Sequence, residues 1–230
     1  MAIRHEKQAD TAKQKSTLIT THQYLDVYPI KASDELLILG TIHPHFVADF
    51  KTAFFYGNRN SLWNLLHDAF PAELPANYSL RDIIQFLAKR RIAISDSILS
   101  CRRKKNSSLD IDLEVISLNM PLIQQIRTSA ITRIYCTSGF GKNNSFKLFY
   151  EEILGLKITK EIREARQVEL APSIFGRSVT VYILPSPSGA ANIALSQTAA
   201  YKQSPYYGSD STRPVYDYKV SLYKEYFKVD

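Results

Sequence analysis

The sequence predicts an α/β fold, a three-layer α/β/α sandwich around a central, mainly parallel four-stranded sheet. Two observations lead to this prediction. Short apolar segments of strand length recur along the chain, and longer segments with apolar residues at helical spacing lie between them. Strands that alternate with helices form a parallel sheet that helices cover on both faces.

The four predicted strands are short runs rich in apolar residues. In chain order they are LLILG (36–40), IAIS (92–95), RIYCTS (133–138) and VTVYIL (179–184). Runs of this kind are typical of parallel strands that are buried on both faces. Each run ends at or before Gly, Asp or Pro, so we expect all four strands to lead into small, polar, rigid loops.

The predicted helices lie between these strands and after the last one. They cover 61–70, 80–91, 121–131, 144–154 and 215–227. Pro71 stops the first helix, and Gly155 ends the fourth. Ser79 caps the second, whose apolar residues fall on one helical face, and Pro121 is well tolerated near the start of the third.

Length and composition predict one domain. The 230 residues, 45% of them hydrophobic, suit a single globular domain at 23–230. Residues 1–22 are polar and lack periodicity, which indicates an N-terminal arm. The sequence has no apolar run of about 18 residues and no apolar segment typical of a secretory signal. We therefore expect no membrane association and a cytoplasmic monomer, associated with the nucleoid if the source is bacterial.

The chain offers few metal ligands and a surplus of positive charge. Cys101 and Cys136 are too few for a four-cysteine zinc or iron–sulfur site, and no third ligand lies at a recognisable spacing from His43 and His45. We expect no metal. The net charge of +7 is compatible with a polyanionic partner. The basic cluster 102–105 either faces phosphates or is a solvated segment end.

Two of the strand exits have side chains suited to ligand binding, and parallel sheets bind ligands at the carboxyl ends of their strands. In GTIHP (40–44), His43 could hydrogen-bond a substrate, position a water molecule, or be structural. In LPSPSGAAN (184–192), two prolines stiffen a loop with Ser hydroxyls. This loop is either a phosphate site or an ordinary strand-to-helix turn.

A third segment, FFYGNRNSLWNLL (54–66), combines aromatic rings with asparagines. One interpretation places Phe54, Phe55 or Tyr56 against a planar ligand, with Asn58 or Asn60 bonding to its polar edge. The other interpretation is a core fragment that precedes a helix.

Together with ISDSILSCRRKKNSSLD (94–110), these segments resemble motifs of the uracil-DNA glycosylase superfamily. LILGTIHP is similar to its first motif, FFYGNRNSLWNLL to its aromatic and asparagine motif, and LPSPSGAAN to the loop that contacts the DNA strand. The resemblance is greatest to the branch with the hypoxanthine-DNA glycosylases, and next to the mismatch-specific uracil glycosylases. The four segments occur in the order and spacing of the superfamily.

This resemblance implies a DNA glycosylase of base-excision repair. Such an enzyme flips uracil, hypoxanthine or xanthine out of DNA and hydrolyses its N-glycosidic bond. DNA would be the partner, and no metal or other cofactor would be needed. The alternative is a catalytically weak or inactive module that binds nucleobases or nucleic acid. A third possibility is an enzyme of free nucleosides or nucleotides.

The resemblance also implies roles for individual residues. Phe55 falls at the base-stacking aromatic position, and Asn60 at the asparagine implicated in catalysis. The predicted site residues are His43 and Asn60 for catalysis; Gly40, Phe55, Tyr56, Asn58, Ser108 and Asp110 for the base; and Arg102, Arg103, Lys104, Pro185, Ser186, Pro187 and Ser188 for DNA.

The chain departs from the superfamily pattern in three places. His43 stands where the first motif commonly has the Asp or Asn that positions water, so either His43 or Asn60 would take that role. Leu184 stands where the classical uracil enzymes have a His. The insert 203–214 has no counterpart, and either contacts DNA or forms a surface loop.

Overall fold

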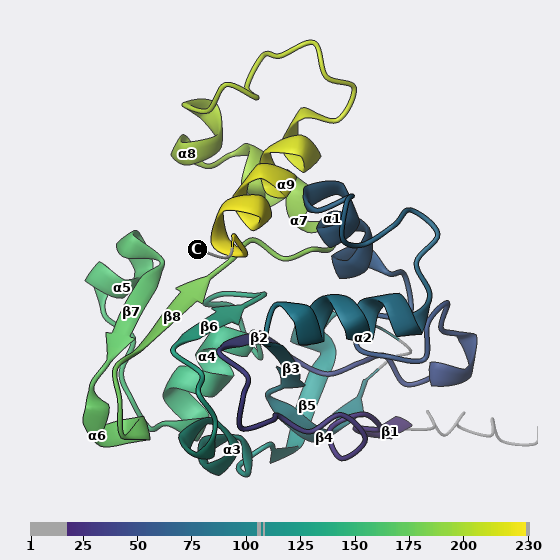
Figure 1. Ribbon diagram of the computed structural model, residues 1–230. Helices are drawn as coiled ribbons and strands as arrows, with labels where there is room; N and C mark the ends of the chain where they lie inside the picture. Colours follow the sequence, from purple (N-terminus) through teal and green to yellow (C-terminus); the bar gives the residue numbers. More distant parts are fainter. Residues whose placement is uncertain (1–17, 105–106, 108, 229–230) are drawn as a thin grey trace, which may run out of the picture.

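The computed structural model describes residues 18–104, 107 and 109–228. It confirms the α/β prediction, with a parallel-rich sheet flanked by helices (Figure 1). The strand order is β3-β2-β6-β8-β7. The bounds are β2 Leu36–Gly40, β3 Ile92–Asp96, β6 Arg133–Cys136, β7 Gln167–Leu170 and β8 Val179–Ile183.

The prediction of four strands was wrong by one, because β7 adds a fifth. This edge strand pairs antiparallel to β8, whereas the other neighbouring strands of the sheet are parallel. β7 is short, and only its last residue, Leu170, is fully buried. It therefore lacks the continuous apolar run that identified the other four strands.

Side chains of the central strands alternate between two hydrophobic clusters, one on each face. Leu36 and Ile38 of β2 pack in a cluster with residues of α1 (Ser61–Ala69), α2 (Leu80–Lys89) and α9 (Pro214–Tyr226). Leu37 and Leu39 pack in the opposite cluster, with residues of α3 (Leu122–Thr128) and α4 (Ser145–Lys147). This alternation produces the three layers that are seen in Figure 1.

The local sequence signals account for several helix ends. The Ser79 side chain accepts a hydrogen bond from the Asp82 amide, and the Asp82 carboxylate accepts one from the Ser79 amide, so α2 begins with a capping box. The predicted helix 144–154 is α4 followed by a π-helical segment, η3 (Leu148–Ile153), before Gly155 at φ 68°. The remaining helices of this layer are α5 (Lys160–Ala165) and α6 (Pro172–Phe175).

A second sheet was not predicted. It consists of β1 (Leu18–Thr21), β4 (Ile98–Arg103) and β5 (Leu113–Leu118), paired antiparallel in the order β1-β4-β5. β1 thus lies within the segment 1–22 that we predicted as an arm, and residues 1–17 of that segment lie outside the described residues. The described residues also form two short 3₁₀ helices, η1 (Val47–Asp49) and η2 (Asp110–Asp112).

The C-terminal part adds a small helical extension. α7 (Ala191–Ser196), α8 (Ala199–Lys202) and the predicted insert 203–214 precede α9, and the α8–α9 connection projects at the top of Figure 1. Its own small apolar cluster contains Leu195, Tyr201 and Tyr218. In the described part of the chain, no helix has the length and apolar character needed to cross a membrane.

Candidate active site at the carboxyl edge of the sheet

The parallel register brings the ends of β2, β3, β6 and β8 to one edge of the sheet. Gly40 lies opposite Asp96, and Cys136 lies opposite both Leu39 and Ile183. The residues that follow these strands therefore meet in one region, as the sequence predicted.

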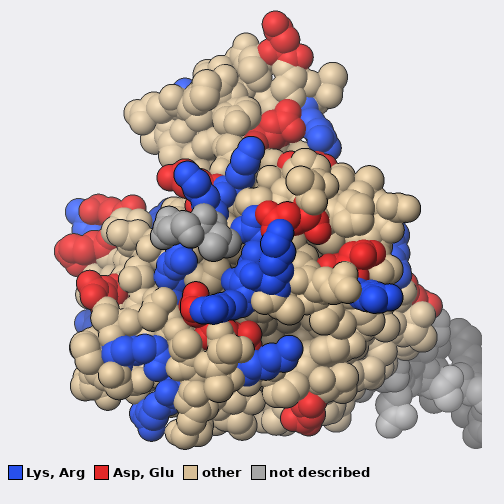
Figure 2. Space-filling model, viewed as in Figure 1, with Lys and Arg blue, Asp and Glu red and all other residues tan. Residues whose placement is uncertain are grey.

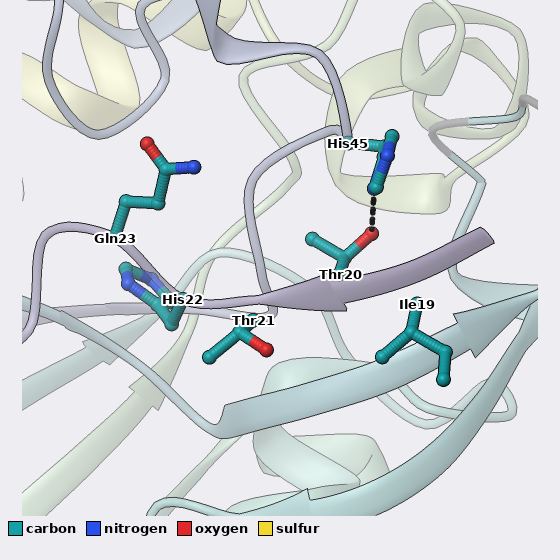
Figure 3. Close-up of a pocket in the computed structure, with 6 residues that line it drawn as sticks. All are labelled: Ile19, Thr20, Thr21, His22, Gln23 and His45. Atoms are coloured by element: carbon teal, nitrogen blue, oxygen red, sulfur yellow. Dashed lines mark hydrogen bonds between the residues drawn. The ribbon is translucent and has the colours of Figure 1, made fainter.

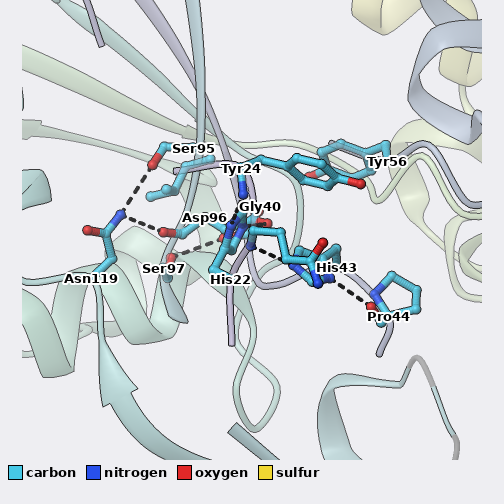
Figure 4. Close-up of polar contacts among 12 residues, drawn as sticks. His22, Tyr24, Gly40, His43, Pro44, Tyr56, Ser95, Asp96, Ser97 and Asn119 are labelled. Carbon is cyan, nitrogen blue, oxygen red and sulfur yellow. Dashed lines mark hydrogen bonds and ion pairs between the residues drawn. The ribbon is translucent and has the colours of Figure 1, made fainter. Parts of the chain in front are cut away.

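Gly40 is the point over which two polar groups converge (Figure 4). A Cβ atom at this position would lie 2.2 Å from Asp96 Oδ1 and 2.5 Å from the Tyr56 hydroxyl. A side chain at this position would force both groups to shift, so glycine favours this arrangement. The absence of a side chain lets a carboxylate and a phenol approach the end of β2 together.

Tyr56 spans the edge from β2 to β6. Its hydroxyl forms a 2.6 Å hydrogen bond with Thr137 Oγ1, and its backbone adopts a left-handed conformation with φ 57°. Burial, with a smaller contribution from the Asp96 charge, holds the pKa of the phenol well above its usual value. Tyr56 is therefore a neutral hydrogen-bonding group in this region, and its role in base binding stays a prediction.

Asp96 is held by His22, the residue that follows β1. His22 Nε2 lies 2.8 Å from Asp96 Oδ2, and the Tyr24 amide donates a 3.1 Å hydrogen bond to His22 Nδ1. Because Nδ1 accepts, the proton of the neutral ring is on Nε2 and is directed to Asp96. The Asn119 side chain fixes the backbone of the same residue by a 2.9 Å bond to the Asp96 carbonyl.

His43, a predicted catalytic residue, is committed to the backbone at both ring nitrogens. The Gln23 amide donates to Nε2 at 3.0 Å, and Nδ1 lies 2.7 Å from the Pro44 carbonyl. The side chain is buried, and burial lowers the pKa of the imidazole. His43 therefore lies in this region as a neutral ring whose two nitrogens are both used by backbone groups, one in its own loop and one in the segment after β1.

Asp110, a predicted pocket residue, lies beside the exit of β2. Its Oδ2 accepts a 3.2 Å hydrogen bond from the Thr41 hydroxyl. Burial, reinforced by the Asp96 charge, raises the pKa of this carboxyl to about 7. Two carboxyl groups with different environments thus lie at this edge. Ser108, predicted with Asp110, lies outside the described residues.

Residues of the segment 54–66, predicted to bind the base, lie partly in the hydrophobic core and partly near the strand exits. Phe55 is 1% exposed, and its ring packs against His22 and Tyr24 at centroid distances of 5.3 and 5.6 Å, so its stacking surface is covered. Asn60 adopts a left-handed conformation at the start of α1, and its Oδ1 is buried without a hydrogen-bond partner among the described residues. Asn58 is half-buried.

The predicted DNA loop is tied to α9. Lys219 donates a 3.0 Å hydrogen bond to the Ser188 carbonyl, and Tyr223 donates one of 2.8 Å to the Pro185 carbonyl. Within the loop, the Ser186 hydroxyl accepts from the Ser188 amide. Pro187 is buried, whereas Ser188 is exposed. Burial lowers the pKa of the Lys219 ammonium to about 8.

The predicted DNA-binding cations differ in exposure. Arg103 is 1% exposed and donates to Thr20 Oγ1 and to the carbonyls of Ser107 and His43, so it joins three segments and is not a surface cation. Arg102 pairs with Glu114 at the surface, and Lys104 is exposed. Figure 2 shows basic and acidic side chains intermingled on one face, with Lys and Arg gathered near its centre.

Sequence reasoning did not single out His22, Asp96 or Lys219 as site residues, although the structure places them at or beside this edge of the sheet. Asp96 lay in a quoted motif and at a strand exit, which was a usable signal, whereas His22 and Lys219 depend on tertiary contacts. A shallow hollow of about 300 Å³ also lies along β1, between His22, Gln23 and His45 (Figure 3). It is next to the site rather than over Gly40.

The described residues hold no cluster of three or more His, Cys, Asp or Glu that could bind a metal ion. Cys101 and Cys136 are both buried, and burial raises the pKa of their thiols. Neither is a nucleophile in its present environment.

No protein-family model matches the chain, and no curated protein matches it. Among solved structures, the chain is similar to the solution NMR structure of a protein described as a candidate uracil DNA glycosylase from Methanosarcina acetivorans. The two are 16% identical, with a TM-score of 0.48, over 90% of this chain and 98% of the other. We therefore infer the function from the chain's own side chains.

Proposed function

We propose that this chain is a monofunctional DNA N-glycosylase of base-excision repair, acting on uracil, hypoxanthine or xanthine flipped out of DNA. One observation supports it most directly. Three of the segments that resemble the glycosylase superfamily supply Gly40, Tyr56 and Asp96, and the Tyr56 hydroxyl and Asp96 carboxylate both lie beside Gly40 at the carboxyl edge of the sheet. The fourth segment is the loop 185–188 at the end of β8, which shares that edge.

These groups suit the chemistry. Cleavage of an N-glycosidic bond develops positive charge on the sugar and negative charge on the leaving base. A carboxylate stabilises the first, and hydrogen-bond donors directed at the base stabilise the second. The Tyr56 hydroxyl is a candidate donor to the base, and the unpartnered Oδ1 of Asn60 is a candidate acceptor for an N–H of the base. The hydroxyls of half-buried Ser186 and exposed Ser188 can contact DNA phosphates.

A second candidate is a nucleobase-binding module without turnover. It is favoured by one feature, the commitment of both His43 nitrogens to backbone groups. This module would bind DNA with an unpaired or damaged base and leave it intact.

Excision assays on a panel of oligonucleotides test the proposal. Purified protein is incubated in EDTA with single- and double-stranded DNA containing uracil, hypoxanthine or xanthine, and abasic sites are detected by alkaline cleavage. We expect cleavage of at least one substrate. Asn60→Ala should lower the single-turnover rate by about 100-fold. Asn64→Ala, one turn along α1 at an exposed position, is the matched control and should retain the rate.

DNA binding without cleavage of any of these substrates would refute the enzyme and support the binding module. Cleavage of a free nucleoside in the absence of DNA binding would instead assign the site to small-molecule chemistry.

A further inference from the structure

The first motif lacks an acidic or amide residue, and the structure offers another group to hold the water molecule. His43 uses both ring nitrogens for the Gln23 amide and the Pro44 carbonyl. Asp96, on the adjacent strand end, places Oδ1 within 2.2 Å of where a Gly40 Cβ would be. The described residues make no hydrogen bond to this oxygen, and the Asp96 side chain keeps 6% exposure, so Oδ1 can accept a hydrogen bond from water.

The other oxygen of Asp96 is fixed by a histidine of defined tautomer. The Tyr24 amide occupies His22 Nδ1, and the proton on Nε2 is directed at Asp96 Oδ2, 2.8 Å away. Rings of Phe55 and His43 surround the imidazole at centroid distances of 5.3 and 4.7 Å. The carboxylate is therefore held in one orientation, with Oδ1 turned to the end of β2 (Figure 4).

The backbone of His22 is anchored as firmly as its side chain. β1 pairs with β4, and the His22 amide donates a 2.8 Å hydrogen bond to the Leu99 carbonyl, three residues beyond Asp96. The buried Arg103 guanidinium bonds to Thr20 in β1 and to the His43 carbonyl. The antiparallel sheet thus fixes the backbone of His22 close to Asp96 at the end of β3.

We propose that Asp96 is the catalytic carboxylate of this site and that His22 is its positioning residue. This proposal rests on the proposed glycosylase function. As the C1′–N bond breaks, its electron pair passes to the base. The oxygen of a water held by Asp96 Oδ1 bonds to C1′, and the water gives a proton to the carboxylate. The departing base takes up a proton from solvent, and Asp96 later returns its own to solvent, which completes a hydrolysis.

Asp96→Asn tests the charge without removing the hydrogen bond. The Asn oxygen can still accept from His22 Nε2, so the fold should be retained. We expect the single-turnover excision rate to fall by about 100-fold or more, with DNA affinity within about twofold of the unmodified chain. Formate should raise the rate of Asp96→Ala but not that of Asn60→Ala.

Asp34→Asn is the matched control. Asp34 is also a buried carboxylate, 7% exposed, and accepts a 2.7 Å bond from the Lys31 amide. It precedes β2 at the amino edge of the same sheet, far from the strand exits. Its replacement should leave the excision rate unchanged.

His22 is tested by two replacements. His22→Gln can supply an N–H donor near the position of Nε2, whereas His22→Ala cannot. We expect His22→Ala to lower the excision rate by about 10- to 100-fold and His22→Gln to restore most of it, both at unchanged DNA affinity. Equal rates in the two variants, or a loss explained wholly by weaker DNA binding, would overturn the positioning role.

The outcomes separate the two levels of inference. If the unmodified chain excises a base and Asp96→Asn does so at the same rate, the carboxylate assignment is wrong and the glycosylase function stands. If the unmodified chain excises none of the bases, the function fails and the assignment fails with it.

Discussion

The two sheets of this molecule contribute to the candidate site in different ways. The five-stranded sheet is apolar and buried, and it supplies the strand ends at Gly40, Asp96 and Thr137. The three-stranded antiparallel sheet and its loops supply polar groups that surround those ends, namely His22, Arg103 and Asp110. The buried sheet thus sets the position of the site, and the antiparallel sheet determines how its side chains are held.

Among substitutions that test this comparison, we expect the largest loss of unfolding free energy from removing the Arg103 side chain, which links the two sheets. Arg103→Met takes away a buried guanidinium and leaves three acceptors, on Thr20, His43 and Ser107, without their donor. Each buried acceptor left unsatisfied costs about 1–3 kcal/mol. We expect the free energy of unfolding, measured by urea denaturation, to fall by about 3 kcal/mol or more.

Arg102→Met is the neighbouring control. Arg102 lies on the same strand, and its partner Glu114 is also exposed. Exposed ion pairs contribute about 0–1 kcal/mol, so the free energy of unfolding should change by no more than this amount. A comparable loss in both variants would mean that the antiparallel sheet is stabilised by general charge rather than by the Arg103 contacts.

We expect a smaller loss of unfolding free energy from a substitution at Gly40, at the carboxyl edge of the five-stranded sheet. Gly40→Ala places a methyl group 2.2 Å from Asp96 Oδ1 and 2.5 Å from the Tyr56 hydroxyl, so both side chains must shift. Overpacking of this kind costs about 1–3 kcal/mol. We expect a loss of unfolding free energy in this range, together with a loss of excision activity. Gly189→Ala, where no atom lies within 4 Å, should be neutral in both measurements.

The same contrast explains what the sequence could predict. β2 and β8 were recognisable because burial on both faces demands continuous apolar runs such as LLILG and VTVYIL. β4, ILSCRR, mixes buried and half-buried residues without regular alternation and ends in two arginines, so only its basic end was noticed in the sequence. The location of the candidate site at the strand exits could be predicted from the alternation of strands and helices, because a parallel sheet binds ligands at the carboxyl ends of its strands. The His22–Asp96 contact could not be predicted, because its residues are 74 positions apart and no periodicity links them.

Asp110 lies where the two sheets meet, and its titration should report on that junction. It begins η2, just before β5, and bonds to Thr41 at the exit of β2. Burial raises the pKa of its carboxyl from 3.8 to about 7 in the folded chain. Between these values the folded chain keeps a proton on Asp110 that the unfolded chain releases, so the contribution of Asp110 to stability is complete below about pH 4 and is lost as pH rises through about 7.

Asp110→Asn should remove this pH dependence, because the amide is neutral throughout. One such group changes the free energy of unfolding by at most about 1.4 kcal/mol per pH unit. We expect the unmodified chain to lose at least about 1 kcal/mol relative to Asp110→Asn between pH 5 and pH 7.5, measured by urea denaturation. Asp49→Asn, at an exposed position in η1, should follow the unmodified chain. Parallel curves for Asp110→Asn and the unmodified chain would show that Asp110 is already ionised, and that the junction of the sheets is open to water.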